Sequence, residues 1–332
     1  MRKWVLPEAI DDVLPDEAAR LEALRRTLLD HFRAHGYRLV RPPLIEHLES
    51  LLTGSGRDLE LQTFKIADPM SGHLLGVRAD ITPQVARIDA HLLNVPGVTR
   101  LCYAGSVLRT VATGPGAARE VIQVGAELFG EPGIAGDSEV IALLLSSLEA
   151  AGLRELHLDL GHIGVYRALA EGAGIAGHVD DNDLFEALSI KDAPAVASLC
   201  TRLPAVWRDA FAALPAMYGP ADEVLRNARE RLPDTPSIAQ ALTALERVAH
   251  QAATRVAGIS IDLGDLRGYH YQNGAIFAAY VAGEASPVGN GGRYDGIGKA
   301  FGRARPATGF TLDLRQLATV VARSESRSGV GG

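Results

Sequence analysis

Two stretches decide the fold class of this chain: Thr99-Arg-Leu-Cys-Tyr-Ala-Gly-Ser-Val-Leu108 and Glu120-Val-Ile-Gln-Val-Gly-Ala-Glu-Leu-Phe129. Both have the composition of β-strands, and a loop that contains Gly114-Pro-Gly116 joins them. Consecutive strands joined by short connections imply a largely antiparallel sheet. Because amphipathic helical patterns flank this pair in the sequence, we expect an α+β fold.

The segments before this pair predict alternating helices and short strands. Residues 16–36 carry apolar side chains at helical spacing, with Asp16 as the expected N-cap. Residues 44–52 predict a second helix, and a turn-rich linker within residues 62–78 indicates a hairpin. Thr82 followed by Pro83 is typical of a helix start, and this helix is expected to end near residue 93.

The segments after the pair predict a helix at residues 140–151, capped by Asp137 or Ser138, and then a strand. Residues 164–255 are alanine-rich, helix-forming and interrupted by prolines, which indicates a helical insertion. Strands are expected again at 258–262 and 274–281, before a last helix at 313–322. The predicted division is therefore a core of residues 1–163 and 256–323, an insertion at 164–255, and a disordered tail at 324–332.

Composition limits the classes of function. With 332 residues and 47% hydrophobic content the chain can bury a large core. Its 33 basic and 40 acidic residues give a net charge of −7, which disfavours nucleic acid as a partner. Two cysteines fit a reducing compartment, so we expect a cytoplasmic protein. The most apolar run is about half as long as a bilayer span requires, so no membrane role is expected.

Several segments resemble histidyl-tRNA synthetases, in the same order along nearly the whole chain. They are Val77-Arg-Ala-Asp-Ile-Thr-Pro83, Leu108-Arg109, Gln123-Val-Gly-Ala-Glu-Leu-Phe-Gly130, Leu266-Arg-Gly-Tyr-His-Tyr271 and Gly291-Gly-Arg-Tyr-Asp-Gly296. Pro43 and Glu46 also match the first class II motif, which lies at the dimer interface in that family. The resemblance implies a class II aminoacyl-tRNA synthetase-like core, with a mainly antiparallel sheet flanked by helices.

The same resemblance implies a site for free histidine. Histidine presents an ammonium, a carboxylate and an imidazole, so a specific site needs acceptors at two ends and a cationic fork at the third. By motif position, Asp80, Thr82 and Gln123 correspond to residues that hold the amino group. Glu127 corresponds to the carboxylate at the imidazole, and Arg267 to the arginine at the histidine carboxylate. The full implied histidine-binding set is Asp80, Thr82, Arg109, Gln123, Glu127, Arg267 and Tyr271.

Departures from the synthetase pattern affect the groups that hold ATP. Val111 stands where the family has a glutamate, and Gly114-Pro-Gly-Ala-Ala118 replaces a basic loop. The third motif reads Asp313-Leu-Arg-Gln316, which removes its arginine, although Arg315 could partly compensate. Gln272 replaces a second tyrosine near the imidazole. Because only a short tail is expected after the last helix, we expect no anticodon-binding domain.

These losses resemble the regulatory subunit family of ATP phosphoribosyltransferase. That resemblance implies no catalytic residue, no cofactor and no metal in this chain. Its implied partners are a short-form catalytic subunit in a hetero-oligomer, a second copy through the class II core, and histidine as effector. Two alternatives stay open at this point: an active histidyl-tRNA synthetase, and a stand-alone histidine-sensing or tRNA-mimicking module.

Ordinary structural explanations compete at several of these positions. Glu127 lies in an alternating strand, where a charged residue usually faces solvent. Asp80 could simply cap the helix that starts at Thr82, and Arg267 could be an ordinary ion-pair residue. His31 and His35 have the spacing of two metal ligands on a helix, but no third ligand is evident. The resemblance favours the ligand role for the first three.

Overall fold

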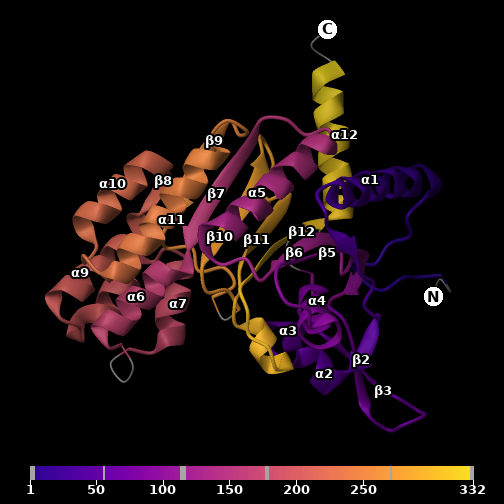
Figure 1. Ribbon diagram of the computed structural model, residues 1–332, viewed down its shortest axis with the longest axis horizontal. Helices are drawn as coiled ribbons and strands as arrows, with labels where there is room; N and C mark the ends of the chain where they lie inside the picture. Colours follow the sequence, from indigo (N-terminus) through magenta and orange to yellow (C-terminus); the bar gives the residue numbers. More distant parts are fainter. Residues whose placement is uncertain (1–3, 55–56, 113–116, 176–178, 270, 330–332) are drawn as a thin grey trace. The chain divides into compact units, whose positions relative to one another are not determined.

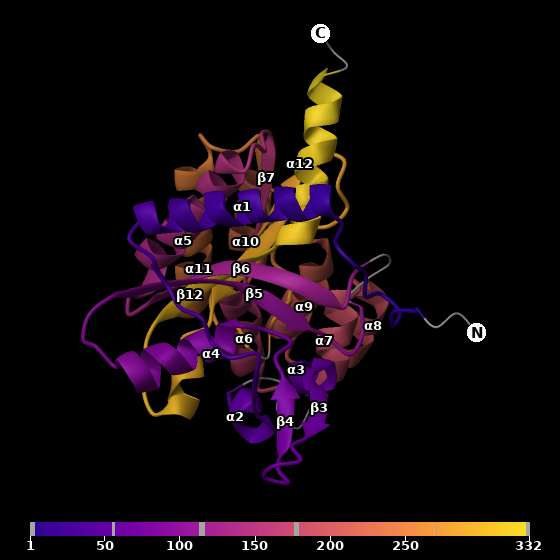
Figure 2. The ribbon, with the colours of Figure 1, turned by 90° about the vertical axis from the view of Figure 1, so that its right-hand side faces the viewer.

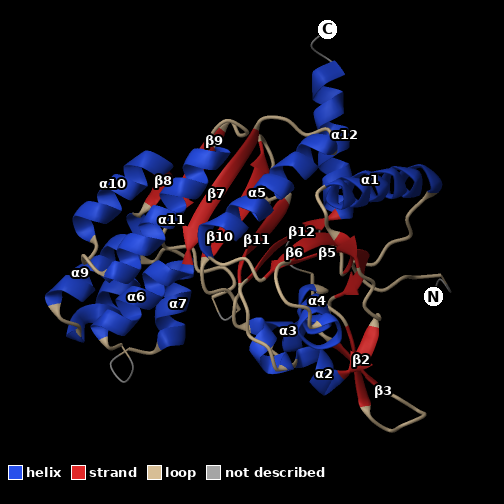
Figure 3. Ribbon diagram, in the orientation of Figure 1, coloured by secondary structure: helices blue, strands red, loops and turns tan. Residues whose placement is uncertain are grey.

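The computed structural model describes residues 4–54, 57–112, 117–175, 179–269 and 271–329. Its contacts group the chain into two compact units. Residues 1–131, 146–154 and 295–332 form the first, and residues 132–145 and 155–294 form the second. Both units combine helices and strands (Figure 1, Figure 3), which confirms the predicted α+β class. The predicted boundaries of core and insertion differ from these units, because the helix-rich segment at 164–255 shares the second unit with several strands.

In the first unit, four strands lie side by side in the order β1 (Arg38–Leu39), β5 (Thr99–Leu108), β6 (Glu120–Phe129) and β12 (Ala307–Asp313). The β5–β6 and β6–β12 pairs are antiparallel, as the sequence predicted for β5 and β6, whereas β1 runs parallel to β5. Strand β6 is buried along nearly its whole length, so side chains on both of its faces are excluded from water.

Helices α1 (Pro15–Ala34) and α12 (Leu314–Gly329) pack against β6, and α1 also contacts β5 (Figure 2). The ring of Phe32 on α1 meets that of Phe310 on β12 edge to face, with centroids 5.8 Å apart. Phe310 pairs directly with Ala126. Since direct cross-strand partners share a face and neighbours along a strand alternate, Gln123, Gly125 and Glu127 belong to the face opposite α1.

A small antiparallel sheet, in the order β2 (Ile45–His47), β4 (Leu74–Val77) and β3 (Phe64–Ala67), completes the strands described for this unit. The predicted hairpin is confirmed by β3 and β4. The helix predicted at 44–52 is wrong in its first half, because Ile45 pairs with Val77, and α2 covers only Leu48–Leu52. Further helical segments are α3 (Arg57–Gln62), α4 (Thr82–Arg87), the π-helical η1 (Ile88–Leu93) and the 3-10 turn η4 (Ile297–Phe301).

The second unit has strands in the order β11 (Gly289–Arg293), β10 (Ala275–Val281), β7 (Leu156–His162), β9 (Gly258–Asp262) and β8 (Tyr218–Pro220). Helix α11 (Pro236–Ala252) packs against β7 and β10, and α10 (Ala221–Arg231) packs against β8 and β9. Further helical segments are α6 (Ile163–Ala173), α7 (Asp181–Ser189), α8 (Ala193–Leu199), η2 (Cys200–Arg202), α9 (Ala205–Ala213) and η3 (Leu214–Ala216). The predicted helical character of 164–255 is therefore confirmed, with β8 as an exception.

Helix ends differ from the predictions in physically informative ways. Helix α1 starts at Pro15, and its N-cap is Leu14 rather than Asp16. Helix α5 covers Gly133–Ala150, so Asp137 lies inside it instead of capping it, in a buried ion pair with Arg293 at 2.9 Å. Helix α12 continues to Gly329, past the predicted end near residue 322 and into the tail predicted to be disordered, while residues 330–332 lie outside the described ranges.

The junction between β7 and α6 predicts a pH-dependent stability. His162 is the N-cap of α6, and its Nδ1 accepts a hydrogen bond from the amide of Gly164 at 3.0 Å. Burial, with the nearby charge of Arg293, lowers the pKa of His162 from 6.5 to about 4. Between these two values the unfolded chain binds a proton at this histidine and the folded chain does not. The contribution of His162 to the free energy of unfolding is therefore fully present above pH 6.5 and is lost as the pH falls toward 4.

We expect this one residue to lower the free energy of unfolding by about 1–2 kcal/mol between pH 7 and pH 5. Urea denaturation at both pH values measures the change. The variant His162→Asn keeps a capping acceptor but cannot titrate, so its loss of stability over this interval is expected to be smaller by that amount. An identical pH dependence of His162→Asn and wild type would contradict the assignment.

Candidate functional site

The register of the first unit gathers polar residues on the face of the sheet opposite α1. In one row across the strands, Gly105 pairs with Gln123, which pairs with Asp313. In the next rows Tyr103 lies opposite Gly125, and Glu127 lies opposite Gly309. The sheet thus places the side chains of Gln123 and Glu127 on the same face as Tyr103.

Asp80 and Gln123 are joined by a hydrogen bond next to the start of α4. The Gln123 amide nitrogen donates to Asp80 Oδ1 at 2.9 Å, and its amide oxygen accepts from the backbone of Ile81 at 2.9 Å. Asp80 Oδ1 also accepts from the backbone amide of Thr82 at 2.9 Å. Asp80 therefore accepts a hydrogen bond from an amide at the start of α4, as expected if it helps to cap this helix. The same carboxylate is also bonded to Gln123, a second residue of the predicted site.

Glu127 is buried, with only 1% of its surface exposed, which excludes the alternative of a solvent-facing strand position for this residue. Its Oε1 accepts hydrogen bonds from Thr82 Oγ1 at 3.0 Å and from the hydroxyl of Tyr103 at 3.2 Å. Thr82 is the first residue of α4 rather than its cap, which leaves its hydroxyl available to Glu127. A buried carboxylate held by hydroxyl groups is suited to a cationic or hydrogen-donating ligand such as an imidazole.

Tyr103 belongs to this group, although sequence reasoning did not select it. Its side chain is fully buried, and its pKa is raised well above the usual range by burial and by the charges of Glu127 and Asp80. The hydroxyl therefore stays protonated and donates to Glu127. The available signal was the predicted pairing of the two long strands, but their exact register was needed to place Tyr103 beside Glu127.

Two glycines leave the space that these side chains occupy. A Cβ at Gly309 would collide with the carboxylate of Glu127, and one at Gly125 would collide with the hydroxyl of Tyr103. Neither glycine has a positive φ, so the requirement is for space rather than for backbone freedom. The space that the Glu127 carboxylate and the Tyr103 hydroxyl occupy therefore depends on positions without side chains.

Arg78 fixes the loop that carries Asp80 and Thr82. This arginine is 6% exposed, and its Nε donates to the carbonyl of Ser106 at 2.8 Å, while Nη1 donates to that of Pro42 at 2.9 Å. Burial lowers its pKa, and Glu46 opposes that effect. Because its guanidinium donates to carbonyls of β5 and of the segment before β2, Arg78 holds the loop in place and does not itself serve as a ligand contact.

Arg109 follows the end of β5, and Asp313 is the last residue of β12. Burial raises the pKa of Asp313, against the backbone amides of Gln316 and Arg315 and the charge of Arg109. Asp313 Oδ1 accepts from the amide of Arg315 at 2.9 Å, so it caps α12. The Arg315 side chain points to α1, where its Nε lies 3.6 Å from Glu17.

The structure describes some of the residues that depart from the synthetase pattern at the expected ATP site. Val111 is 60% exposed, and part of the replaced loop, residues 114–116, lies outside the described ranges. Arg315, the residue expected to compensate for Gln316, forms its ion pair with Glu17 instead. The described residues therefore give no sign that Arg315 replaces the missing arginine.

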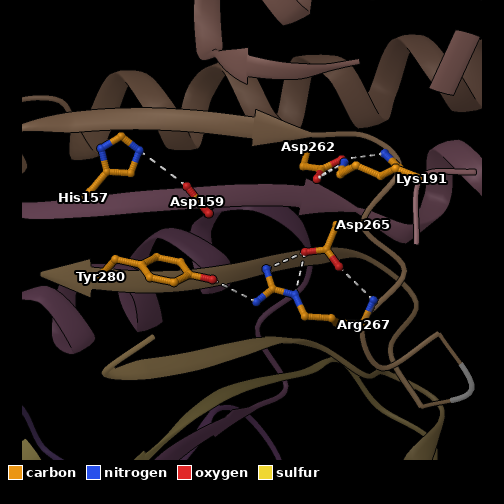
Figure 4. A network of polar contacts seen from close by, with 8 residues as sticks. His157, Asp159, Lys191, Asp262, Asp265, Arg267 and Tyr280 are labelled. Atoms are coloured by element: carbon orange, nitrogen blue, oxygen red, sulfur yellow. Dashed lines mark hydrogen bonds and ion pairs between the residues drawn. The ribbon is translucent and has the colours of Figure 1, made fainter. Parts of the chain in front are cut away.

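In the second unit, Arg267 and Asp265 form an ion pair (Figure 4). Arg267 Nε donates to Asp265 Oδ2 at 2.7 Å, and its Nη1 donates to the hydroxyl of Tyr280 at 3.4 Å. Burial alone would lower the pKa of Arg267, but the hydrogen bond and charge of Asp265, with Tyr280, raise it overall. About half of the Arg267 side chain stays exposed, although each guanidinium nitrogen already has a partner in Asp265 or Tyr280.

Tyr271 lies near Arg267 in sequence and stacks on the buried Tyr294, with ring centroids 5.0 Å apart. The intervening His270 lies outside the described residues. Arg267 and Tyr271 belong to the second unit, and the other predicted site residues belong to the first. The structure therefore brings Asp80, Thr82, Gln123 and Glu127 together, while their assembly with Arg267 and Tyr271 stays a prediction.

His157, Asp159 and Ser260 lie close to Arg267 in the same network but do not form a catalytic triad. Ser260 Oγ lies 2.7 Å from His157 Nε2, and Asp159 Oδ1 lies 3.4 Å from the same nitrogen. A proton relay requires the serine and the carboxylate to use different ring nitrogens. Burial raises the pKa of Asp159, which the charges of His157 and Arg267 oppose.

The two histidines with metal-ligand spacing have other partners. His31 Nε2 lies 2.8 Å from Ser146 Oγ, and His35 Nδ1 lies 2.9 Å from the carbonyl of His31. Within the described ranges, no three His, Cys, Asp or Glu side chains are grouped to hold a metal ion. No helix in those ranges combines the length and apolar character required to cross a membrane.

Known proteins share this architecture. A solved structure described as an ATP phosphoribosyltransferase regulatory subunit/histidyl-tRNA synthetase from Bacillus halodurans is 26% identical, with a TM-score of 0.83 over 97% of this chain and 84% of that one. A histidine–tRNA ligase subunit from Alicyclobacillus acidocaldarius gives a TM-score of 0.76 at 23% identity, over 98% and 99% of the two chains. The family model for histidyl-tRNA synthetase matches residues 9–317.

Fold and site thus define a protein of the histidyl-tRNA synthetase-like class, with a class II core. Sequence relatives narrow the class. ATP phosphoribosyltransferase regulatory subunits from Ralstonia nicotianae and Thiobacillus denitrificans are 56% and 54% identical, over 96% and 98% of this chain and 82% and 100% of those proteins. The chain belongs to the family of ATP phosphoribosyltransferase regulatory subunits.

Proposed function

We propose that this chain is a non-catalytic subunit that assembles with a short-form ATP phosphoribosyltransferase catalytic subunit in the cytoplasm. The partner performs the first step of histidine synthesis, in which ATP and phosphoribosyl pyrophosphate give phosphoribosyl-ATP. The regulatory chain activates the partner on complex formation and conveys feedback inhibition by histidine. Such coupling between two sites typically amounts to about 1–3 kcal/mol.

The observation that carries the proposal is the buried carboxylate of Glu127, in a chain that belongs to the regulatory-subunit family. Thr82 and Tyr103 hold this carboxylate by hydrogen bonds, and Asp80 and Gln123 lie next to Thr82. Burying a charge is costly even when hydrogen bonds offset part of the cost, and such buried ionisable groups are concentrated at functional sites. An imidazole that donates to Glu127, with an ammonium at Asp80, fits the chemistry of this group.

The proposed histidine site also includes Arg267 and Tyr271 of the second unit and Arg109 of the second class II motif. Arg267, whose side chain is about half exposed, meets the ligand carboxylate, and Tyr271 lines the histidine site. Arg109, with charge partner Asp313, borders the same polar face. No cofactor or metal takes part, and this chain supplies no catalytic residue.

The same proposal includes self-association through the class II core. Glu46, of the first class II motif, accepts a hydrogen bond from Gln84 at 2.8 Å and pairs with Arg87 at 2.5 Å. Apolar residues of the small sheet are about half exposed, including Ile45 next to Glu46 on β2 at 48% and Ile66 on β3 at 47%. Exposed apolar residues of this kind favour burial against another protein surface.

The two rival functions, an active synthetase and a stand-alone histidine sensor, differ from the proposed one in ATP binding and in partner binding. An active histidyl-tRNA synthetase needs cations at the triphosphate, and Arg315 is instead paired with Glu17. A stand-alone histidine sensor would keep the pocket and bind no phosphoribosyltransferase. Histidine-dependent pyrophosphate exchange by the chain alone would favour the synthetase.

Mixing the chain with a short catalytic phosphoribosyltransferase from the same organism tests the proposal. At micromolar concentrations, we expect co-sedimentation, a higher turnover of ATP with phosphoribosyl pyrophosphate, and inhibition by added histidine. The variant Glu127→Gln serves as the matched control, because it keeps the shape of the side chain and removes its charge. It is expected to assemble and to activate, but to respond less to histidine. If neither sedimentation, turnover nor inhibition changes on mixing, the partner assignment is wrong.

A further inference from the structure

A second arginine, Arg167 on α6, holds the loop that contains Arg267 and Tyr271. Its Nη2 donates to the backbone carbonyls of Tyr269 and Gln272, each at 3.0 Å. The same guanidinium lies over the ring of Tyr269, with its carbon 5.3 Å from the ring centroid. One side chain of the helical segment therefore contacts the loop at three points.

Tyr269 anchors the loop in the aromatic packing of the helical segment. Its ring meets that of Tyr166 edge to face at 5.1 Å and lies 5.8 Å from that of Phe185 on α7. Tyr166 is fully buried, so the position of this ring is fixed by the core. The loop is thus attached to α6 and α7 by packing as well as by the bonds of Arg167.

The turn that carries Arg267 is closed by the same tyrosine. The amide of Tyr269 donates to the carbonyl of Leu266 at 2.9 Å, which makes Arg267 and Gly268 the central residues of a tight turn. Gly268 has a φ of +71°, a value that favours glycine at this position of the turn. Any movement of Tyr269 away from α6 therefore changes the backbone direction at Arg267.

Tyr271 has independent support, because it stacks on the buried Tyr294 of the second unit. Loss of Arg167 is therefore expected to disturb the turn at Arg267 more than the position of the Tyr271 ring. In the proposed site these two residues serve different parts of the ligand, Arg267 the carboxylate and Tyr271 the imidazole pocket. The contribution of Arg167 should then depend on the ligand carboxylate.

We propose that Arg167 is a positioning residue for histidine recognition, through which α6 sets the turn that presents Arg267 to the ligand carboxylate. The inference rests on the proposed histidine-binding function. It gives the helical segment a role in ligand binding, since Arg167 lies in the second turn of α6, whose N-cap is His162. Histidine binding at Arg267 is thereby linked to the position of α6.

The test compares histidine with histidinol, which lacks the carboxylate, by calorimetric titration of the full chain. For Arg167→Ala we expect a rise of about tenfold in the dissociation constant of histidine and less than about twofold in that of histidinol. Arg167→Lys keeps the charge but not the fork, and should give an intermediate loss for histidine. Arg226→Ala, at an exposed position of α10, is the control and should change neither.

The possible outcomes distinguish a failure of the positioning role of Arg167 from a failure of the proposed histidine binding. Equal losses for both ligands, or an unchanged affinity for histidine in Arg167→Ala, would overturn the positioning role while the histidine site survives. A wild-type chain that binds neither ligand would overturn the proposed function, and the inference with it. Thermal unfolding of all variants identifies a loss of fold, and Arg167→Lys keeps the test decisive if Arg167→Ala is unstable.

Discussion

Gly309→Ala is expected to disable the candidate pocket, with a rise in the dissociation constant of histidine well above about tenfold. The added methyl group would occupy the position of the Glu127 carboxylate, which lies directly opposite on β6. Glu127 is 1% exposed, so it has little room to move aside. Overpacking of this kind also costs about 1–3 kcal/mol of stability.

Gly296→Ala is the matched control for this prediction. A Cβ at Gly296 meets no atom within 4 Å, and this glycine has a φ of −82° that alanine adopts readily. Histidine titration and urea denaturation of both variants measure the two effects. If Gly309→Ala binds histidine as wild type does, the ligand does not use the Glu127 carboxylate, and the pocket lies elsewhere.

The elements of regular structure were largely predictable, because they depend on local patterns. The two long strands β5 and β6 and their antiparallel pairing followed from composition and a short connection. The segment at 44–52 failed because its apolar spacing suits a helix, while Ile45 and His47 pair with β4 in the fold. Such pairing is a tertiary effect that a single segment does not encode.

The site was predictable in its residues but not in its arrangement. Motif resemblance selected Asp80, Thr82, Gln123 and Glu127, and the structure brings these four side chains together. Tyr103 and Gly309 were missed, because their roles depend on the register of strands far apart in sequence. The cap predicted at Asp137 was wrong for a similar reason, since its carboxylate pairs with the distant Arg293.

Asp265 was also missed, and it changes the physical account of Arg267. The resemblance assigned Arg267 to the ligand carboxylate, with an ordinary ion pair as the alternative, and the structure pairs it with an acid two residues away. A histidine carboxylate must therefore share the guanidinium with Asp265, whose side chain is 13% exposed. Removing Arg267 has two consequences at once: a lost ligand contact and an unpaired carboxylate.

Arg267→Ala is expected to raise the dissociation constant of histidine by roughly 10- to 150-fold, because a charge-assisted contact contributes about 1.5–3 kcal/mol. The same variant leaves Asp265 without its cation, which should lower stability as well. The double variant Arg267→Ala/Asp265→Asn separates the two effects. Asparagine removes the unpaired charge, so stability should largely return, whereas the ligand contact stays lost and histidine should still bind weakly.

Calorimetric titration and thermal unfolding of wild type, Arg267→Ala and the double variant measure both quantities in the same preparations. Recovery of stability without recovery of affinity assigns the binding loss to the contact between Arg267 and the ligand carboxylate. Recovery of both would instead mean that the stranded charge of Asp265 caused the loss, and that the guanidinium serves only its ion pair. Arg267 would then be structural, and the carboxylate of histidine would require a different cation.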